Sequence, residues 1–149
     1  MARITASVYT SHVHAIGAAL DLGKSGEPYW QPVFKGYEFS KQWLRENTPT
    51  NASVGTLEVG IIGFHSQRRM IDFAGLIQPE VGSQFTQYAT YEDSAKWAAE
   101  HYHPDYLALF EGDLPRFEHG YIAQHCTMIQ SFPANPYLYS SYMNVYACR

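Results

Sequence analysis

The apolar run at residues 105–112 constrains the fold of this 149-residue chain more than any other stretch. It reads DYLALFEG, and His103-Pro104 ends the preceding helical pattern. A continuous apolar run bounded by turn signals is typical of a central strand that is covered on both faces. The chain is therefore expected to place helices on both sides of a sheet.

Predicted strands and predicted helices alternate along the chain before and after this run. Strands are also predicted at residues 4–10, 53–57 and 69–75, and helices at residues 36–49, 58–66, 91–102 and 114–124. Thr90 followed by Glu92 and Asp93 indicates a helix start, because a capping hydroxyl and acids in the first turn suit the positive end of the helix dipole. This alternation predicts an α/β fold, a three-layer αβα sandwich with a mostly parallel sheet of about five to six strands.

The last two predicted strands form a C-terminal antiparallel hairpin. They read CTMIQSF (126–132) and YMNVYAC (142–148). The register that pairs Phe132 with Tyr142 also places Cys126 opposite Cys148, so a cross-strand disulfide is geometrically possible. Two buried free thiols are the alternative if the protein is made in a reducing compartment.

Composition excludes several classes of partner. The net charge is −4, and Lys and Arg are scattered, whereas nucleic acid and anionic membranes require a clustered basic face. No apolar run approaches the roughly 20 residues that cross a bilayer, and no signal peptide is recognisable. We therefore expect a soluble chain, cytoplasmic when expressed, that can self-associate through the edge strand of its terminal hairpin.

Candidate metal ligands gather at one edge of the predicted sheet. Ligands of open α/β sheets bind at the carboxyl ends of the strands. His12 and His14 follow the first strand, Glu58 follows the second, and Glu111 and Asp113 follow the central strand. Histidines with a carboxylate suit a divalent metal, so the candidate metal ligands are His12, His14 and Glu58. The alternative is that they are ordinary loop and surface residues.

Covalent catalysis has no support in the sequence. No serine or cysteine lies in a nucleophile elbow such as G-x-S-x-G with a base nearby. No catalytic residue is therefore predicted, and no cofactor is expected unless the metal site forms.

Residues 1–47 resemble an iron enzyme. The stretch MARITASVYTSHVHAIGAALDLGKSGEPYWQPVFKGYEFSKQW is similar to the N-terminus of the protocatechuate 4,5-dioxygenase β subunit, in the family of class III extradiol dioxygenases that use non-haem iron. The resemblance implies that His12, in the SH motif after the first strand, matches an iron ligand. The segment that carries the second histidine of that family has no match after Pro49, and the remaining ligand and the catalytic histidine would lie beyond residue 149. The resemblance implies at most a reduced site for Fe(II) or another divalent metal.

From about Trp43 to Arg149 the chain resembles a different family. The stretches that carry this resemblance are WLRENTPTNASVGTLEVGIIGFHSQRRMIDFAGLIQPEV, YEDSAKWAAEHYHPDYLALFEG and VYACR. They are similar to the extracytoplasmic C-terminal domain of membrane glycosyltransferases of the dolichyl-phosphate-mannosyltransferase type. The catalytic acids of that family lie in its membrane part, so the resemblance implies a binding or interaction module without transferase activity.

The two resemblances meet in a seam at about residues 43–49, inside the predicted helix. Such a change indicates a chimeric chain, artificial or recombined, with a natural fusion or a mis-assembled gene as the alternative. We expect residues 1–149 to form a single α/β domain without inherited catalytic function, held together by Phe39, Trp43 and Leu44 of the seam helix. The alternatives are a reduced dioxygenase-like metal-binding protein and an extracytoplasmic binding module.

Overall fold

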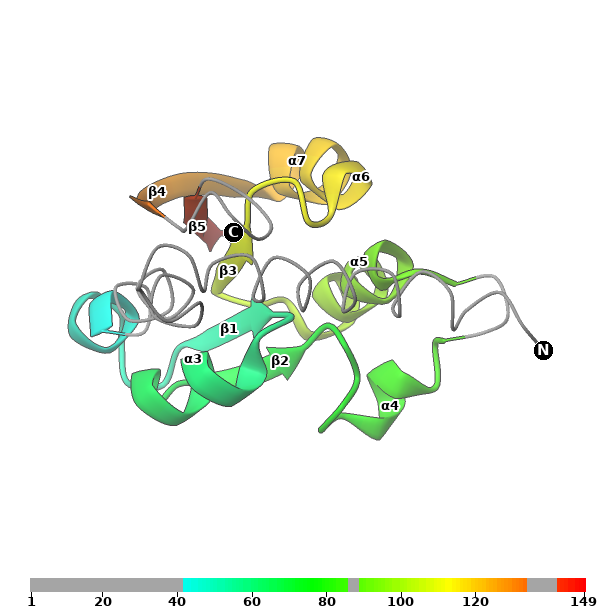
Figure 1. The fold of residues 1–149 in the computed structure, drawn as a ribbon, viewed down its shortest axis with the longest axis horizontal. Coiled ribbons are helices and arrows are strands. Elements are labelled where there is room, and N and C mark those ends of the chain that lie inside the picture. The colour runs from blue at the N-terminus through cyan, green and yellow to red at the C-terminus, as the bar shows by residue number, and fades with distance from the viewer. Residues whose placement is uncertain (1–41, 86–88, 134–141) are drawn as a thin grey trace, which may run out of the picture.

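The computed structural model describes residues 42–85, 89–133 and 142–149. Five strands in these ranges form one sheet in the order β2-β1-β3-β5-β4 (Figure 1). They are β1 (Ser53–Thr56), β2 (Arg69–Asp72), β3 (Tyr106–Phe110), β4 (Cys126–Pro133) and β5 (Tyr142–Cys148). The α/β class, the central place of β3 and the C-terminal hairpin are confirmed, whereas the strand predicted at 4–10 lies outside the described residues.

The sheet is mixed. Strand β1 pairs in parallel with both β2 and β3, whereas β5 pairs antiparallel with both β3 and β4. The expected parallel arrangement therefore holds only for the β2-β1-β3 half. The physical reason is the terminal hairpin, whose second strand inserts beside β3 and turns the remaining pairings antiparallel.

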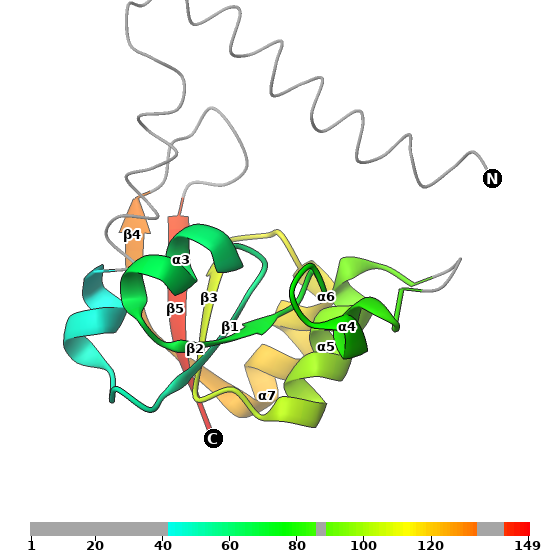
Figure 2. The ribbon, with the colours of Figure 1, turned by 90° about the horizontal axis from the view of Figure 1, so that it is seen from below.

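Helices flank the sheet on both sides (Figure 2). The helix at 42–47 and α3 (Val59–Ser66) lie on one side, and α5 (Tyr91–Tyr102) lies on the other. The segment from 115 to 125 lies on the side of α5 and contains α6 (Pro115–Phe117), the π-helical turn η2 (Glu118–Ile122) and α7 (Ala123–His125). A short α4 (Pro79–Gly82) lies between β2 and α5, where the sequence predicted neither a helix nor a strand. No helix of the described ranges is long and apolar enough to cross a bilayer.

Strand β3 is buried from both sides. Leu107 and Leu109 belong to the apolar cluster that contains the buried alanines of α5. Ala108 and Phe110, which alternate with them, belong to a second cluster with Leu44 from the helix at 42–47. Side chains of a strand point alternately to opposite faces, so the two clusters are the two faces of the sheet.

The start of α5 is the capping box that Thr90 and Asp93 predicted. The Asp93 N–H donates to Thr90 Oγ1 at 3.3 Å, and the Thr90 N–H donates to Asp93 Oδ2 at 2.8 Å. The Thr90 hydroxyl also donates to Asp93 Oδ2 at 2.8 Å, and this hydrogen bond and then that of the Thr90 N–H hold the pKa of Asp93 below its usual value. The helix ends at His103, a left-handed residue with φ 46°. The boundaries of α5 are therefore set by residues next to it in the sequence, by the side chain of Thr90 at the start and by the backbone of His103 at the end.

A buried arginine ties the helix at 42–47 to α3. Arg68 is 8% exposed, and its guanidinium donates to the carbonyl oxygens of Arg45 (2.7 Å), Thr48 (2.8 Å) and Ser66 (3.0 Å). It also donates to Thr48 Oγ1 at 2.9 Å. These acceptors lie at or just beyond the C-terminal ends of both helices, where carbonyl groups lack intrahelical partners and a cation is favoured.

The seam helix is part of the packed body. Leu44 is fully buried, and Trp43 packs against the same cluster. Phe39, the third residue expected to pack here, lies outside the described residues. The predicted seam therefore runs through a helix that is held both by apolar packing and by Arg68.

The terminal hairpin is closed by a disulfide. Cys126 and Cys148 lie opposite each other and are bonded, with a Cα–Cα distance of 4.1 Å. The sequence left this pairing and two free thiols open, and the structure has the disulfide.

The predicted register of the hairpin holds from Cys126 to Met128 and is wrong by one residue from Gln130 onward. Phe132 pairs with Met143 and not with Tyr142. A register shift between Met128 and Gln130 inserts one extra residue into β4, as a β-bulge does.

Candidate functional site

One of the three predicted metal ligands lies in the described part of the chain. Glu58 follows β1, is half-buried, and its N–H donates to Thr56 Oγ1 at 3.0 Å. His12 and His14 lie outside the described residues. Within 42–85, 89–133 and 142–149, no group of three or more His, Cys, Asp or Glu residues is placed to hold a metal ion. The metal site therefore stays a prediction.

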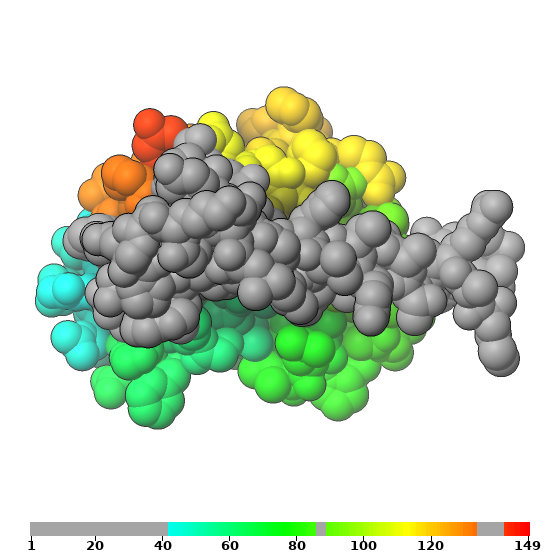
Figure 3. Space-filling model, viewed as in Figure 1, coloured from blue at the N-terminus to red at the C-terminus, as the bar shows by residue number. Residues whose placement is uncertain are grey.

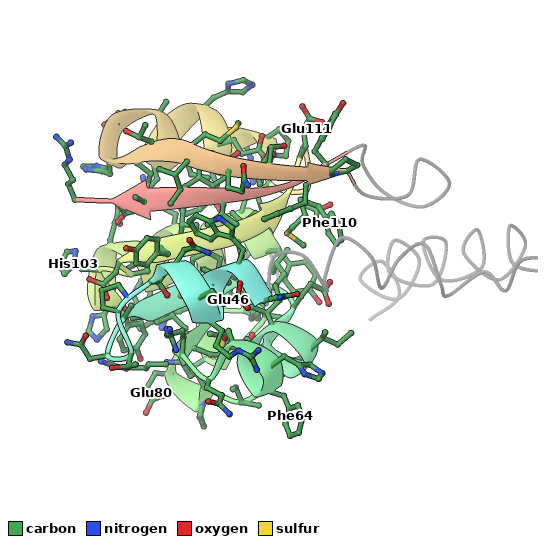
Figure 4. All side chains as sticks on the ribbon, turned by 90° about the vertical axis from the view of Figure 1, so that its left-hand side faces the viewer. Glu46, Phe64, Glu80, His103, Phe110 and Glu111 are labelled. Carbon is green, nitrogen blue, oxygen red and sulfur yellow. A yellow bond between two sulfur atoms is a disulfide. The ribbon has the colours of Figure 1, made fainter. Side chains whose placement is uncertain are left out.

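The carboxyl ends of β1 and β3 bring acidic side chains together. Burial, and then the nearby carboxylates of Glu58 and Glu118, raise the pKa of Asp113 to about 7. Glu118 is positioned by the Gly112 N–H, which donates to its Oε1 at 2.9 Å. Glu111, also predicted at this edge, is exposed at the end of β3 (Figure 4). Asp113 can therefore hold or release a proton near neutral pH.

Because the pKa of Asp113 is raised in the folded chain, we expect the free energy of unfolding to depend on pH. The unfolded chain loses the Asp113 proton near pH 3.8, whereas the folded chain keeps it to about pH 7. Stability should therefore be highest below pH 3.8 as far as this group is concerned, fall between pH 4 and 7, and level off above 7. Asp113→Asn should raise the free energy of unfolding at pH 8 by about 2 kcal/mol, allowing for screening of a partly exposed group.

Urea unfolding at pH 5 and pH 8 measures this effect. Glu111→Gln is the matched control, because Glu111 is exposed and the substitution removes one carboxylate from the same turn. An equal gain for both variants at pH 8, or no gain for Asp113→Asn, would show that burial of Asp113 does not hold its proton.

A groove runs between α5 and the segment 115–125. It has a volume of about 320 Å³. Figure 3 shows the segment 115–125, in yellow and orange, next to the light-green atoms of α5 at the upper right. The residues that line the groove are mostly polar: Glu92, Asp93, Lys96 and Glu100 of α5, with Arg116, Phe117, Gly120, Tyr121, Gln124 and His125 opposite.

Arg116 fixes one end of the groove. Its side chain forms an ion pair with Glu92, its backbone N–H donates to Glu92 Oε1 at 3.0 Å, and its Nη2 donates to Thr90 Oγ1 at 3.0 Å. The hydrogen bond to Glu92 raises the pKa of the Arg116 guanidinium. The start of α6 is thereby joined to the start of α5.

Three aromatic rings in contact form the wall of the groove that faces α5. Phe117 stacks on Tyr121 with ring centres 5.2 Å apart, and Tyr121 contacts His125 with centres 4.6 Å apart. Phe117 is buried in the core, and the Tyr121 hydroxyl donates to the Ala99 carbonyl oxygen at 3.3 Å. Burial and then Glu100 raise the pKa of Tyr121. The wall is therefore anchored both in the core and on α5.

Gly120 is a position in the groove lining that has no side chain. It lies in the π-helical turn η2, a rare conformation that often marks functional positions. A Cβ atom built on Gly120 would meet nothing within 4 Å. A side chain at this position would therefore extend into space that is now free.

One family comparison matches most of the chain. The family described as "Domain of unknown function (DUF8728)" matches residues 30–146. The chain belongs to this family. The DUF8728 match begins before the seam predicted at 43–49 and continues through it, and it includes every residue that lines the groove. No solved structure matches the chain.

The groove of this DUF8728 chain was not predicted from the sequence. Both walls were predicted as helices, but their packing against each other depends on Arg116 reaching Glu92 across 24 positions. The contact of Tyr121 with His125, one helical turn later, was also not predicted. Gly120 inside a helical pattern was the one available signal, because glycine is disfavoured there without a local reason.

Proposed function

We propose that the chain is a non-catalytic binding module, built as a three-layer α/β domain, that takes a neutral polyhydroxylated ligand such as an oligosaccharide in the groove between α5 and 115–125. The observation that carries this proposal is the lining of the groove. Hydrogen-bonding side chains of both charges surround the open position at Gly120, against walls fixed by the core and by Arg116. Concave sites with a few convergent polar groups are where small molecules bind.

The balance of charge in the groove favours a neutral ligand. Glu92, Asp93 and Glu100 contribute carboxylates, and Lys96 and Arg116 contribute cations. Arg116 is paired with Glu92, and Lys96 lies 3.8 Å from Glu100. An anion would face three carboxylates, and a cation would face two fixed positive groups. Hydroxyl groups can donate to the carboxylates and accept from lysine, arginine or the Gln124 amide.

The lining supports binding without covalent turnover. It contains no serine, threonine or cysteine that could act as a nucleophile. Asp113, whose pKa is near neutral, does not line the groove. These features agree with the glycosyltransferase resemblance, in which the catalytic acids belong to a membrane part.

The disulfide favours an oxidising compartment. Disulfides persist outside the cytoplasm and are rare inside it. Cys126 follows α7 directly, so the covalent link lies next to the last residue of the groove wall, His125. An extracytoplasmic binding module is therefore the function that these residues support best.

Substitutions at Gly120 test the site. Gly120→Trp should fill the groove and weaken binding of oligosaccharides at least about tenfold, a loss of about 1.4 kcal/mol. Gly120→Ala is the matched control, since its methyl group meets no atom and alanine favours the helix. Binding is measured by titration with a panel of soluble neutral oligosaccharides, together with thermal unfolding of each variant.

The expected result is equal affinity for the native chain and Gly120→Ala, lost affinity for Gly120→Trp, and melting temperatures that are not lowered. The bound oligosaccharide should be recovered intact. Undiminished binding by a folded Gly120→Trp, or no binding by the native chain across the panel, would overturn the proposal.

A further inference from the structure

The tripeptide Asn51-Ala52-Ser53 matches the acceptor motif for N-linked glycosylation, which is N-x-S/T with any residue except proline in the middle. The other asparagines of the chain lack a serine or threonine two positions later. The Cys126–Cys148 disulfide favours an oxidising compartment, and proteins that carry N-linked glycans are made in such a compartment. The chain therefore combines the motif with a bond that suits the place of its modification.

The structure leaves the Asn51 side chain accessible. Asn51 is exposed, in the turn between the helix at 42–47 and β1. The Ala52 N–H closes this turn by donating to the Pro49 carbonyl oxygen at 3.0 Å. Glycans are bulky and need a surface position. The folded chain can therefore carry one on Asn51 without rearranging its core.

The third residue of the motif is placed differently. Ser53 begins β1 and is only 7% exposed. Its hydroxyl donates to Asp105 Oδ2 at 2.7 Å and accepts from the Asp105 N–H at 3.1 Å. A transferase that reads this hydroxyl cannot reach it while Asp105 holds it. Recognition of the motif therefore has to precede the pairing of β1 with β3.

We propose that Asn51 carries an N-linked glycan, added before β1 takes its place beside β3. The donor is an oligosaccharide on a polyisoprenyl pyrophosphate lipid. The side-chain nitrogen of Asn51 forms a bond to the anomeric carbon of the first sugar and loses one proton to a base of the transferase. The bond from that carbon to the pyrophosphate oxygen breaks, and the lipid pyrophosphate leaves with the electron pair. Nothing is oxidised or reduced in this step.

A hollow beside Asn51 offers space for the first sugar. It has a volume of about 290 Å³, and Pro49, Asp105 and Tyr106 also line it. The Asp105 carboxylate and the Tyr106 hydroxyl are groups that can bond to sugar hydroxyls. Asn51 does not line the groove between α5 and 115–125, so a glycan here is independent of the ligand proposed for that groove.

Expression of the full chain in eukaryotic cells, behind a cleavable signal peptide, tests the site. The recovered chain should carry one glycan beyond its mass of 16.9 kDa, and peptide-N-glycosidase should remove it and leave an aspartate at position 51. Asn51→Gln should be unmodified. Asn47→Gln is the matched control and should keep the glycan, because Asn47 is also exposed but is followed by Thr48-Pro49.

Two further comparisons test how the motif is read. Ser53→Thr should stay glycosylated, and Ser53→Ala should not, although Asn51 is present in both. Purified oligosaccharyltransferase with its lipid-linked donor should modify the reduced, alkylated chain and leave the folded, oxidised chain unmodified. Three results would overturn the proposal: an unmodified native chain recovered from the cells or the medium, a glycan that persists in Asn51→Gln, and a folded chain that is modified as fast as the unfolded one.

Discussion

Arg68→Ala should lower the free energy of unfolding by about 3 kcal/mol, the largest loss that we expect from one side chain. The substitution leaves the carbonyl oxygens of Arg45, Thr48 and Ser66 without the donor they now share. A buried polar group without a partner costs about 1 to 3 kcal/mol. The helix at 42–47 should therefore detach first, with loss of the packing of Leu44.

Arg69→Ala is the control, because the neighbouring arginine is exposed. Its stability should stay within about 0.5 kcal/mol of the native chain. Arg68→Lys should fall between the two, because an ammonium group cannot reproduce the planar fork of a guanidinium. Chemical denaturation of the three variants measures the differences. Equal losses for Arg68→Ala and Arg69→Ala would show that Arg68 does not join the two helices.

Reducing the Cys126–Cys148 disulfide should lower the free energy of unfolding by about 3 kcal/mol, because the bond closes a loop of 22 residues in the unfolded chain. The groove wall should also become less stable, since its last residue, His125, lies next to Cys126. The His125 carbonyl oxygen accepts the Arg149 N–H at 3.0 Å, so the hairpin end and the end of α7 are held together.

The double substitution Cys126→Ser with Cys148→Ser separates the bond from the reducing agent. This variant should be as unstable as the reduced native chain and should not respond to dithiothreitol. Thermal melts with and without the reductant measure both effects. A native melt that is unchanged on complete reduction would mean that the bond does not stabilise the hairpin.

Local patterns predicted most of the individual elements. The run DYLALFEG became the central strand because its alternate residues fill two different apolar clusters. Thr90 and Asp93 predicted the start of α5, because the cap needs only residues three positions apart. The helix predicted at 58–66 corresponds to α3 with a difference of one residue at its start.

Features that depend on distant residues were missed. The antiparallel pairing of β3 with β5 joins segments more than thirty residues apart. The residues of a strand do not by themselves show which other strand lies beside it. The bulge in β4 was missed although Met128-Ile129 interrupts the alternation of the strand. Pro79 at the first position of α4, followed by Glu80, was a helix-start signal that was missed.

Hydrogen bonds cross the seam at 43–49. Arg68, from one side of it, binds carbonyl oxygens of residues 45 and 48 within it. The DUF8728 match also spans the seam. The chimeric origin inferred from two resemblances stays a prediction, and the residues that would carry the dioxygenase-like metal site, His12 and His14, lie outside the described part of the chain.

Backbone NMR of the native chain during titration with the neutral oligosaccharides tests the groove most directly. We expect the amide shifts to concentrate in residues 92–100 and 116–125, to saturate, and to leave the oligosaccharide uncleaved. Saturable shifts that concentrate elsewhere, for example at the carboxyl ends of β1 and β3 around Glu58 and Asp113, or cleavage of the ligand, would contradict a non-catalytic binding site in this groove.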